Sequence, residues 1–447
     1  MIVALSLCLV LALAFEVSNG FHDSANAVAT VIYTNSLKPF HAILWSGLMN
    51  FLGVMLGGTA LAFALVDLLP VHLLSNSDGH AIIALLLAVF TAALTWNLAT
   101  WWLGLPNSSS HAIIGALVGA AVADAIAQHR SLSHGVNWSQ VGTALQALLL
   151  SPLLGFVLAG LLFLGLRGLV HEPSLYQAPT GRTPPVWWLR LILLATCTGV
   201  SFAHGTNDGQ KSLGLIMLVI ISLWPTAYGI NHQVPSNQVR ELAEALEGTN
   251  ALVAQDGGNP DRLGPSATPT VIHRLRTAKS LAALPVDEKS ALHHQITQLL
   301  PELQRIVKAR SSSEAAQTQA INRYRQLRGV EYVPGWVRLV SALGLGLGTL
   351  FGYRRIVRSL GTRIGRQRLV PAQGGSAETV AALLIGTAGV TGLIVSTTHV
   401  VTSGIAGTMI AAGAGLEGGF VWRIVASWLL TLPATLLLSG VLFLLLT

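Results

Sequence analysis

The chain has 447 residues, of which 52% are hydrophobic and only 10% are charged. Soluble domains hold roughly a quarter charged residues, so this composition excludes an ordinary soluble enzyme and indicates a protein embedded in lipid. The net charge is +7, but no basic face interleaved with aromatic residues is present, which excludes a nucleic-acid partner. Cys8 and Cys197 lie in apolar runs without metal-ligand spacing, which excludes a disulfide framework and a zinc cluster.

Ten segments are apolar over the length of roughly 20 residues that a membrane-spanning helix needs. The first and sixth are too long for one straight span and contain polar residues. The fourth and ninth are short and rich in glycine and alanine, which favours re-entrant segments over full membrane spans. In chain order the ten are 2–33, 40–66, 81–103, 110–127, 141–167, 190–224, 335–353, 378–395, 398–415 and 420–446.

The basic residues of the short loops predict the orientation, because Lys and Arg collect on the cytoplasmic side. Loop 354–368 is rich in arginine and is predicted to be cytoplasmic, together with the 169–189 linker. Loop 67–80 is acidic and is predicted to lie outside. The residues behind this assignment are Arg354, Arg355, Arg358, Arg363, Arg366, Arg368, Arg182, Lys38, Asp67 and Asp78.

Segment 225–334 interrupts the apolar pattern. It contains 22 of the charged residues and falls on the outer side, so it is predicted to be a polar periplasmic insertion. Within it, 238–247 has helical spacing and 256–269 is a linker rich in glycine and proline.

Two motifs occur twice, which indicates an internal duplication. Gly20-Phe-His-Asp23 returns as Gly205-Thr-Asn-Asp208, and Ser108-Ser-Ser-His111 returns as Ser396-Thr-Thr-His399. The first repeat is assigned to 1–168, and the second to 190–224 plus 335–447. Five segments in each half would place the second half upside down in the membrane, which is the inverted-repeat plan of transporters with broken helices meeting at the midplane.

The first motif pair places acids and amides inside apolar segments, where an ionisable group costs several kcal/mol and usually has a function. Asp23 and Asp208 therefore suit a coupling cation or proton, although packing through hydrogen bonds is the alternative. His22, beside Asp23, is a candidate titrating group. Lys211 occupies the position of Asn26 in the repeat and would neutralise Asp208 or attract an anion.

The second motif pair places Ser and Thr directly before apolar helical stretches, as helix N-caps are placed. A helix N-terminus offers free N–H groups and a positive dipole end, so two such ends would suit an oxyanion. Plain N-capping is the alternative. His111 and His399 follow the caps and are predicted to hydrogen-bond neighbouring groups. Glu378 begins the eighth segment and would either join a cation site or mark an interface.

The four motifs together resemble the inorganic phosphate transporter (PiT) family, whose hallmarks are a duplicated G-A-N-D-V-A-N-A-type motif and P-x-S-x-T-H-type loops. The His-Asp-Ser-Ala-Asn-Ala form of the first motif and the long insertion are similar to the bacterial low-affinity group. The resemblance implies phosphate binding by Ser108, Ser109, Ser110, Ser396, Thr397 and Thr398. It implies cation or proton coupling through Asp23, Asn26, Asn207 and Asp208.

Two positions depart from the family pattern. His22 stands where the general motif has Asn, which argues against a sodium site and fits the proton coupling of the bacterial group. Ile394 stands where a proline often precedes the Val-Ser-Thr-Thr-His run, which leaves the entry angle of that helix open. The group is also associated with neutral metal-phosphate, and pairing phosphate with a divalent cation would lower its desolvation cost.

The sequence therefore predicts an all-α inner-membrane phosphate symporter that is driven by protons and works by alternating access. It is not expected to be an enzyme or to need a cofactor, and a homodimer is compatible with it. A sulfate or other oxyanion permease and sodium-coupled phosphate transport are the alternatives. A membrane hydrolase of phosphorylated lipids is disfavoured, because no group that would orient a nucleophile–base pair is evident.

Overall fold

The computed structural model describes the chain from residue 2 to 447, with gaps at several places. The residues left out are 67, 70–78, 179–182, 224–230, 232–233, 256–268, 279, 286–287, 290–291, 293–294, 297–298, 301–302, 304–305, 308–312 and 329–332. All regular elements of the described part are helices, which confirms the all-α prediction. Asp67, Asp78 and Arg182, and nearly all of the predicted 256–269 linker, lie outside the described residues.

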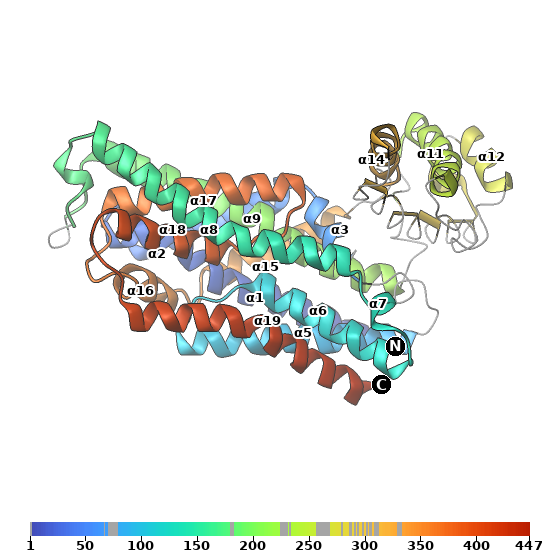
Figure 1. Cartoon of the computed structure of the whole chain (residues 1–447), viewed down its shortest axis with the longest axis horizontal. Coiled ribbons are helices and arrows are strands. Elements are labelled where there is room, and N and C mark those ends of the chain that lie inside the picture. Colours follow the sequence, from blue (N-terminus) through green and yellow to red (C-terminus); the bar gives the residue numbers. More distant parts are fainter. Residues whose placement is uncertain are drawn as a thin grey trace. The chain divides into compact units, whose positions relative to one another are not determined.

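The chain divides into two compact units. The larger one comprises Met1–Pro70, His80–Ile216 and Gly335–Thr447, and the smaller one comprises Val71–Gly79 and Met217–Pro334. The helices of the larger unit (Figure 1) are α1 (Ile2–Tyr33), α2 (Pro39–Leu56), α3 (Ala60–Val66), α5 (Gly79–Leu103), α6 (Ser109–Ala127), α7 (Leu132–Gly135), α8 (Trp138–Leu169), η1 (Pro173–Leu175), α9 (Trp187–Leu223), α15 (Gly335–Thr349), α16 (Arg354–Thr362), α17 (Pro371–Thr391), α18 (Thr397–Ala411) and α19 (Gly418–Leu446).

Several of these helices are long and apolar enough to cross a membrane. Five pass on length and hydropathy, and α15 with α16 forms a sixth candidate that is bent by 62°. The ten predicted segments nearly all coincide with helices, but ten crossings stay a prediction. Two details differ from the expectation: 40–66 is interrupted between α2 and α3, and the predicted 354–368 loop begins with helix α16.

The helix breaks do not occur at the acidic motifs. Helices α1 and α9 run unbroken through Asp23 and Asp208, over 32 and 37 residues. The chain breaks instead just before α6 and just before α18. Gly104 and Gly392 begin these breaks with φ of +67° and +75°, a left-handed conformation that glycine adopts without strain.

Helices α6 and α18 are central, and α8 and α19 cover them. The apolar window of α6 is 83% buried, whereas those of α8 and α19 are only 33% and 22% buried. Close approach of backbones makes this packing possible: a Cβ on Gly119 of α6 would lie 2.1 Å from the Leu436 carbonyl oxygen of α19. A Cβ on Gly407 of α18 would likewise lie 2.1 Å from the Phe156 carbonyl oxygen of α8. Small residues at helix contacts are typical of membrane proteins.

The smaller unit has a core of its own. Its helices are α11 (Ser236–Gln255), α12 (Pro269–Thr277), η3 (Leu281–Ala283) and α14 (Glu314–Arg328). The predicted helix at 238–247 lies within α11. Leu242 and Leu246 of α11 are buried together with Leu275 of α12 and Leu327 of α14. This amphipathic packing explains why the polar segment still forms a compact body.

Candidate functional site

Helices α1 and α9 carry the acidic motifs into the interior of the larger unit. Asp23 and Asn26 are three residues apart on α1, so they share a helix face, and both are buried. On α9, Asp208 and Lys211 have the same spacing and are likewise buried. Carboxylates and an ammonium group at such depth require partners, because an unpaired buried charge is costly.

The serine and threonine motifs form the N-termini of α6 and α18. Ser108 caps α6, and its hydroxyl accepts a hydrogen bond from the backbone N–H of His111 at 3.2 Å. Ser396 caps α18 in the same way, accepting from the N–H of His399 at 3.3 Å. The expectation of N-caps is therefore met for the first residue of each run. The next two hydroxyls of each run remain available for other contacts.

The two helix N-termini meet each other. Ser110 Oγ donates to the backbone carbonyl of Val395, directly before the α18 cap, at 2.9 Å. The imidazole rings of His111 and His399 lie 4.6 Å apart, centroid to centroid, and Trp428 packs on His399 at 3.9 Å. Two positive dipole ends thus converge in the interior of one unit.

Hydroxyls from both N-termini converge on Asp23. Ser109 Oγ donates to Oδ2 of Asp23 at 3.0 Å, and Thr398 Oγ1 donates to Oδ1 of the same carboxylate. Asn26 Nδ2 donates to Thr398 Oγ1 at 2.9 Å, which extends the chain of hydrogen bonds back to α1. His22 contributes more loosely, with Nδ1 3.7 Å from Asp23 Oδ1. The acidic motif of α1 is therefore joined to the serine and threonine motifs at the N-termini of both α6 and α18.

Asp208 lies beside an ammonium group. Lys211 Nζ is 2.6 Å from Asp208 Oδ1 and also donates to Ser110 Oγ at 2.5 Å. Thr397 Oγ1 donates to the same Asp208 oxygen at 3.3 Å, and Ser109 Oγ reaches the other oxygen at 3.5 Å. Ser109 accordingly lies between the two carboxylates.

A possible cation site adjoins these contacts. One ligand atom each of Asp23, His204 and Asp208 lies within 4.8 Å of the others, and all three residues are buried. His204 Nε2 is 3.3 Å from Asp208 Oδ2, and Nδ1–H donates to Asn50 Oδ1 at 2.8 Å. Two carboxylates and an imidazole can bind a divalent cation or share a proton.

Two predicted residues stand apart from this network. Glu378 accepts a hydrogen bond from Thr196 at 2.6 Å, so its carboxylate is engaged with α9 rather than with the aspartates. Asn207 is fully buried, and neither polar atom of its side chain has a hydrogen-bond partner in the described part of the chain.

Sequence reasoning missed two buried groups. His204 lies four residues before Asp208, a spacing that places both on one helix face and could have identified it. Glu16 is buried on α1 and accepts hydrogen bonds from Ser212 and from Ser341, the latter at 3.2 Å. An acid in the middle of an apolar segment was the available signal for Glu16.

The fold and this buried polar centre define a class: a multi-pass membrane protein with two helix N-termini and two acids at its core. Residues 19–439 match the model of the phosphate transporter family. The chain therefore belongs to that family, which confirms the resemblance read from the four motifs. Members of the family are transporters rather than enzymes, so the expectation that the chain is no enzyme is also confirmed.

Several curated proteins are similar over nearly their whole length. The low-affinity inorganic phosphate transporters PitA and PitB of Escherichia coli K12 are 36% and 35% identical to this chain, each over 98% of the chain and 96% of the relative. A probable low-affinity inorganic phosphate transporter of Bacillus subtilis is 28% identical, over 97% of the chain and 95% of the relative. Among solved structures, "The sodium-dependent phosphate transporter" shares the fold, with a TM-score of 0.56, 19% identity and 99% coverage of both chains.

Proposed function

We propose that this protein is a low-affinity inorganic phosphate symporter of the inner membrane, coupled to protons and working by alternating access. The observation that carries the proposal is the sharing of hydroxyl groups: the side chains that would bind phosphate at the two helix N-termini already hydrogen-bond the acids that would bind the coupling ion. Membership in a phosphate transporter family favours phosphate over sulfate as the anion.

Phosphate would bind between the N-termini of α6 and α18. Free N–H groups, hydroxyls and two positive dipole ends stabilise an oxyanion without a dedicated arginine. The predicted set is Ser108, Ser109, Ser110, Ser396, Thr397 and Thr398. A site built mainly from neutral donors binds the anion weakly enough to release it, in keeping with the low-affinity transporters among the relatives.

Coupling would follow from competition for the same hydroxyl donors. An ionised Asp23 accepts from Ser109 and Thr398, so these hydroxyls are turned away from phosphate. A proton on Asp23 removes both this competition and the repulsion between the carboxylate and the phosphate. Phosphate and proton would therefore bind together more tightly than either alone.

A proton fits this site better than sodium does. Lys211 already places a positive charge against Asp208, at 2.6 Å, and so occupies the position that a second cation would take. His204 adds a nitrogen ligand near the aspartates, whereas hard cations prefer oxygen. With His22 beside Asp23, the surroundings of both acids favour proton transfer.

An inverted duplication would supply the two states of alternating access. Two equivalent contacts support it. Asn26 donates to Thr398, and Lys211 donates to Ser110. In the proposed repeat Lys211 corresponds to Asn26, and Ser110 corresponds to Thr398. The breaks before α6 and α18 begin at glycines of the same left-handed conformation. The five-plus-five topology, the cytoplasmic linker at 169–189, the periplasmic placement of 225–334 and a homodimer stay predictions that accompany this scheme.

The test is uptake of radiolabelled phosphate into proteoliposomes under separately imposed proton and sodium gradients. Asp23→Asn should abolish accumulation while the protein still inserts and purifies normally. Asp124→Asn is the matched control, because it makes the same change in a buried acid at the far end of α6 and should leave uptake intact. Unchanged uptake by Asp23→Asn, or uptake driven by sodium alone, would contradict the proposal. Competition by excess sulfate would instead favour a general oxyanion permease.

Metal-phosphate is a second candidate substrate, favoured by the cluster of Asp23, His204 and Asp208. A divalent cation there would enter with phosphate as a complex of lower charge and lower desolvation cost. Uptake of radioactive manganese should then depend on phosphate, and His204→Gln should reduce manganese uptake more than phosphate uptake. If manganese does not accompany phosphate in the wild type, phosphate travels without the metal.

A further inference from the structure

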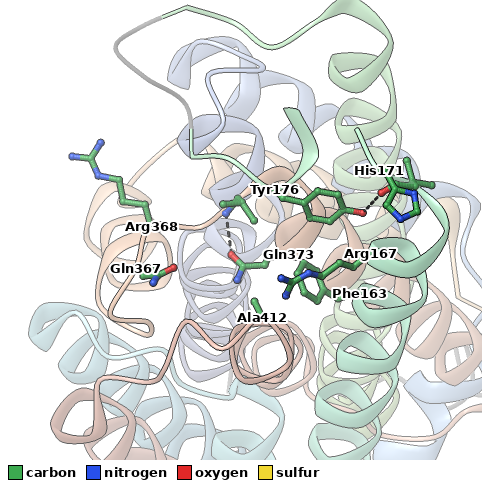
Figure 2. Close-up of a pocket in the computed structure, with 10 residues that line it drawn as sticks. Phe163, Arg167, His171, Tyr176, Gln367, Arg368, Gln373 and Ala412 are labelled. Carbon is green, nitrogen blue, oxygen red and sulfur yellow. Dashed lines mark hydrogen bonds between the residues drawn. The ribbon is translucent and has the colours of Figure 1, made fainter. Parts of the chain in front are cut away.

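A cavity lies away from the acids, at the end of α8. It has a volume of about 400 Å³, and it lies between the last turns of α8, the loop that follows, and the start of α17 (Figure 2). Its lining residues are Phe163, Arg167, Val170, His171, Tyr176, Gln367, Arg368, Val370, Gln373 and Ala412. We call this cavity the Arg167 pocket.

The lining of the Arg167 pocket is basic. It includes two arginines and a histidine but no carboxylate. No ion pair involves Arg167, His171 or Arg368 within the described ranges of the chain, so neither arginine is neutralised there by a neighbouring acid. Burial raises the pKa of the Tyr176 phenol, which the nearby Arg167 partly offsets, so this phenol adds no negative charge.

An amide donor also lines the pocket. Gln373 is 3% exposed, and its Oε1 accepts from the backbone N–H of Val370 at 3.0 Å. For its Nε2 the described residues provide no hydrogen-bond acceptor. Figure 2 shows this amide near the Arg167 side chain, whereas the exposed Arg368 side chain extends away from it. An N–H donor on the wall of a cavity can donate to an oxygen of a bound ligand.

The neighbouring helix surface is apolar and exposed. Leu161, Leu164 and Leu169 of α8 are 59%, 47% and 84% exposed, and α8 is one of the helices long and apolar enough to cross the membrane. Arg167 lies in the last turn of the same helix. The pocket is therefore at the end of a lipid-facing helix, where lipid headgroups lie.

From these observations we propose that the Arg167 pocket binds a phosphate group at the membrane surface, supplied by the headgroup of an anionic phospholipid. Arg167 would bind the phosphate oxygens through charge-assisted hydrogen bonds, and the Gln373 amide would donate to a further oxygen. The exposed Arg368 side chain would turn toward the bound headgroup and add a second positive charge. The acyl chains would lie along the exposed leucines of α8. Inorganic phosphate shares the headgroup's chemistry but would leave those leucines without a role in binding.

Native mass spectrometry of the purified full-length protein, titrated with phosphatidylglycerol or phosphatidylcholine, tests the proposal. Each arginine near the headgroup should contribute about fivefold in affinity, so Arg167→Gln/Arg368→Gln should weaken phosphatidylglycerol binding about 25-fold. Arg167→Lys/Arg368→Lys should retain most of the binding. The matched control is Arg354→Gln/Arg358→Gln, which removes two exposed arginines outside the pocket and should change binding less than threefold. Circular dichroism melting checks that all variants are folded.

Equal binding by the wild type and the Gln variant, or an equal loss in the control, would overturn the proposal. A preference for phosphatidylcholine over phosphatidylglycerol would overturn it as well. A second arm measures binding of radiolabelled inorganic phosphate to lipid-depleted protein. A saturable phosphate site that is lost in the Gln variant, with lipid binding unchanged, would assign the pocket to free phosphate. Because neither arm measures transport, both are independent of the proposed symport.

Discussion

At the scale of single residues, the two acids of the site have different neighbours. Asp208 is paired with Lys211 at 2.6 Å, whereas Asn26, at the position matching Lys211, gives Asp23 no positive charge. Asp23 relies instead on hydroxyls of Ser109 and Thr398. An added cation is therefore attracted less by Asp208 than by Asp23, since the charge of Asp208 is already paired with Lys211.

Replacing Lys211 tests this asymmetry. Lys211→Met keeps the apolar stem but leaves Asp208 buried without its counter-charge. The free energy of unfolding should therefore fall by about 3–5 kcal/mol, the usual cost of breaking a buried ion pair. Melting of the purified protein should show the loss. Asp208→Asn/Lys211→Met removes both charges and should recover most of the stability. If the single and double variants melt alike, the ammonium does not stabilise Asp208.

At the scale of helices, the site depends on how closely backbones approach. The N-terminus of α6 carries Ser109, and α6 packs on α19 through Gly119. A methyl group at Gly119 would clash with the Leu436 backbone, and helix backbone moves less readily than a side chain. Movement of α6 would displace the hydroxyl that lies between the two acids.

A pair of Gly→Ala substitutions separates packing from helix propensity. Gly119→Ala should destabilise the protein by about 1–3 kcal/mol, as overpacking commonly does, and should lower phosphate uptake. Gly165→Ala in α8 is the control, because a Cβ there meets nothing within 4 Å. It should leave uptake unchanged and keep or slightly raise the melting temperature, because alanine is a better helix former than glycine. Equal melting temperatures for the two variants would show that α6 can shift without cost.

At the scale of the whole molecule, two units with separate cores divide the chain. The smaller unit buries leucines of α11 against α12 and α14, and its surface is charged. The exposed pair of Arg276 and Glu247, 2.5 Å apart, joins α12 to α11 but contributes little to stability. The apolar core is therefore what stabilises this unit.

Such a core predicts that the smaller unit folds alone. A fragment covering 231–334 should be soluble and helical, with a cooperative melting transition by circular dichroism. Leu242→Asp places a charge in its core and should abolish that transition. Glu241→Ala changes the adjacent, exposed residue and should leave the transition in place. A fragment that melts without cooperativity would mean that the unit needs the rest of the chain.

The predictions from sequence were most accurate where local pattern decides structure. The predicted segment 2–33 has the same bounds as helix α1, because an apolar run that ends at a polar turn is a local signal. The caps at Ser108 and Ser396 follow from the preference of serine for helix starts. Broken helices were expected to meet at the midplane, but α1 and α9, which carry the acidic motifs, are continuous. In the structure, each buried acid of these motifs accepts hydrogen bonds from hydroxyls of α6 and α18, so no break is needed to satisfy it.

The sequence alone determined that the protein lies in a membrane and that four polar motifs lie within or directly before its apolar segments. These properties follow from composition and local order. Only the tertiary structure decided which groups pair: Asn26 and Thr398 are 372 positions apart, and their hydrogen bond depends on how two helices are rotated and packed. The same is true of His204, Glu16 and the Arg167 pocket, since a buried polar group is satisfied by whatever the fold brings beside it.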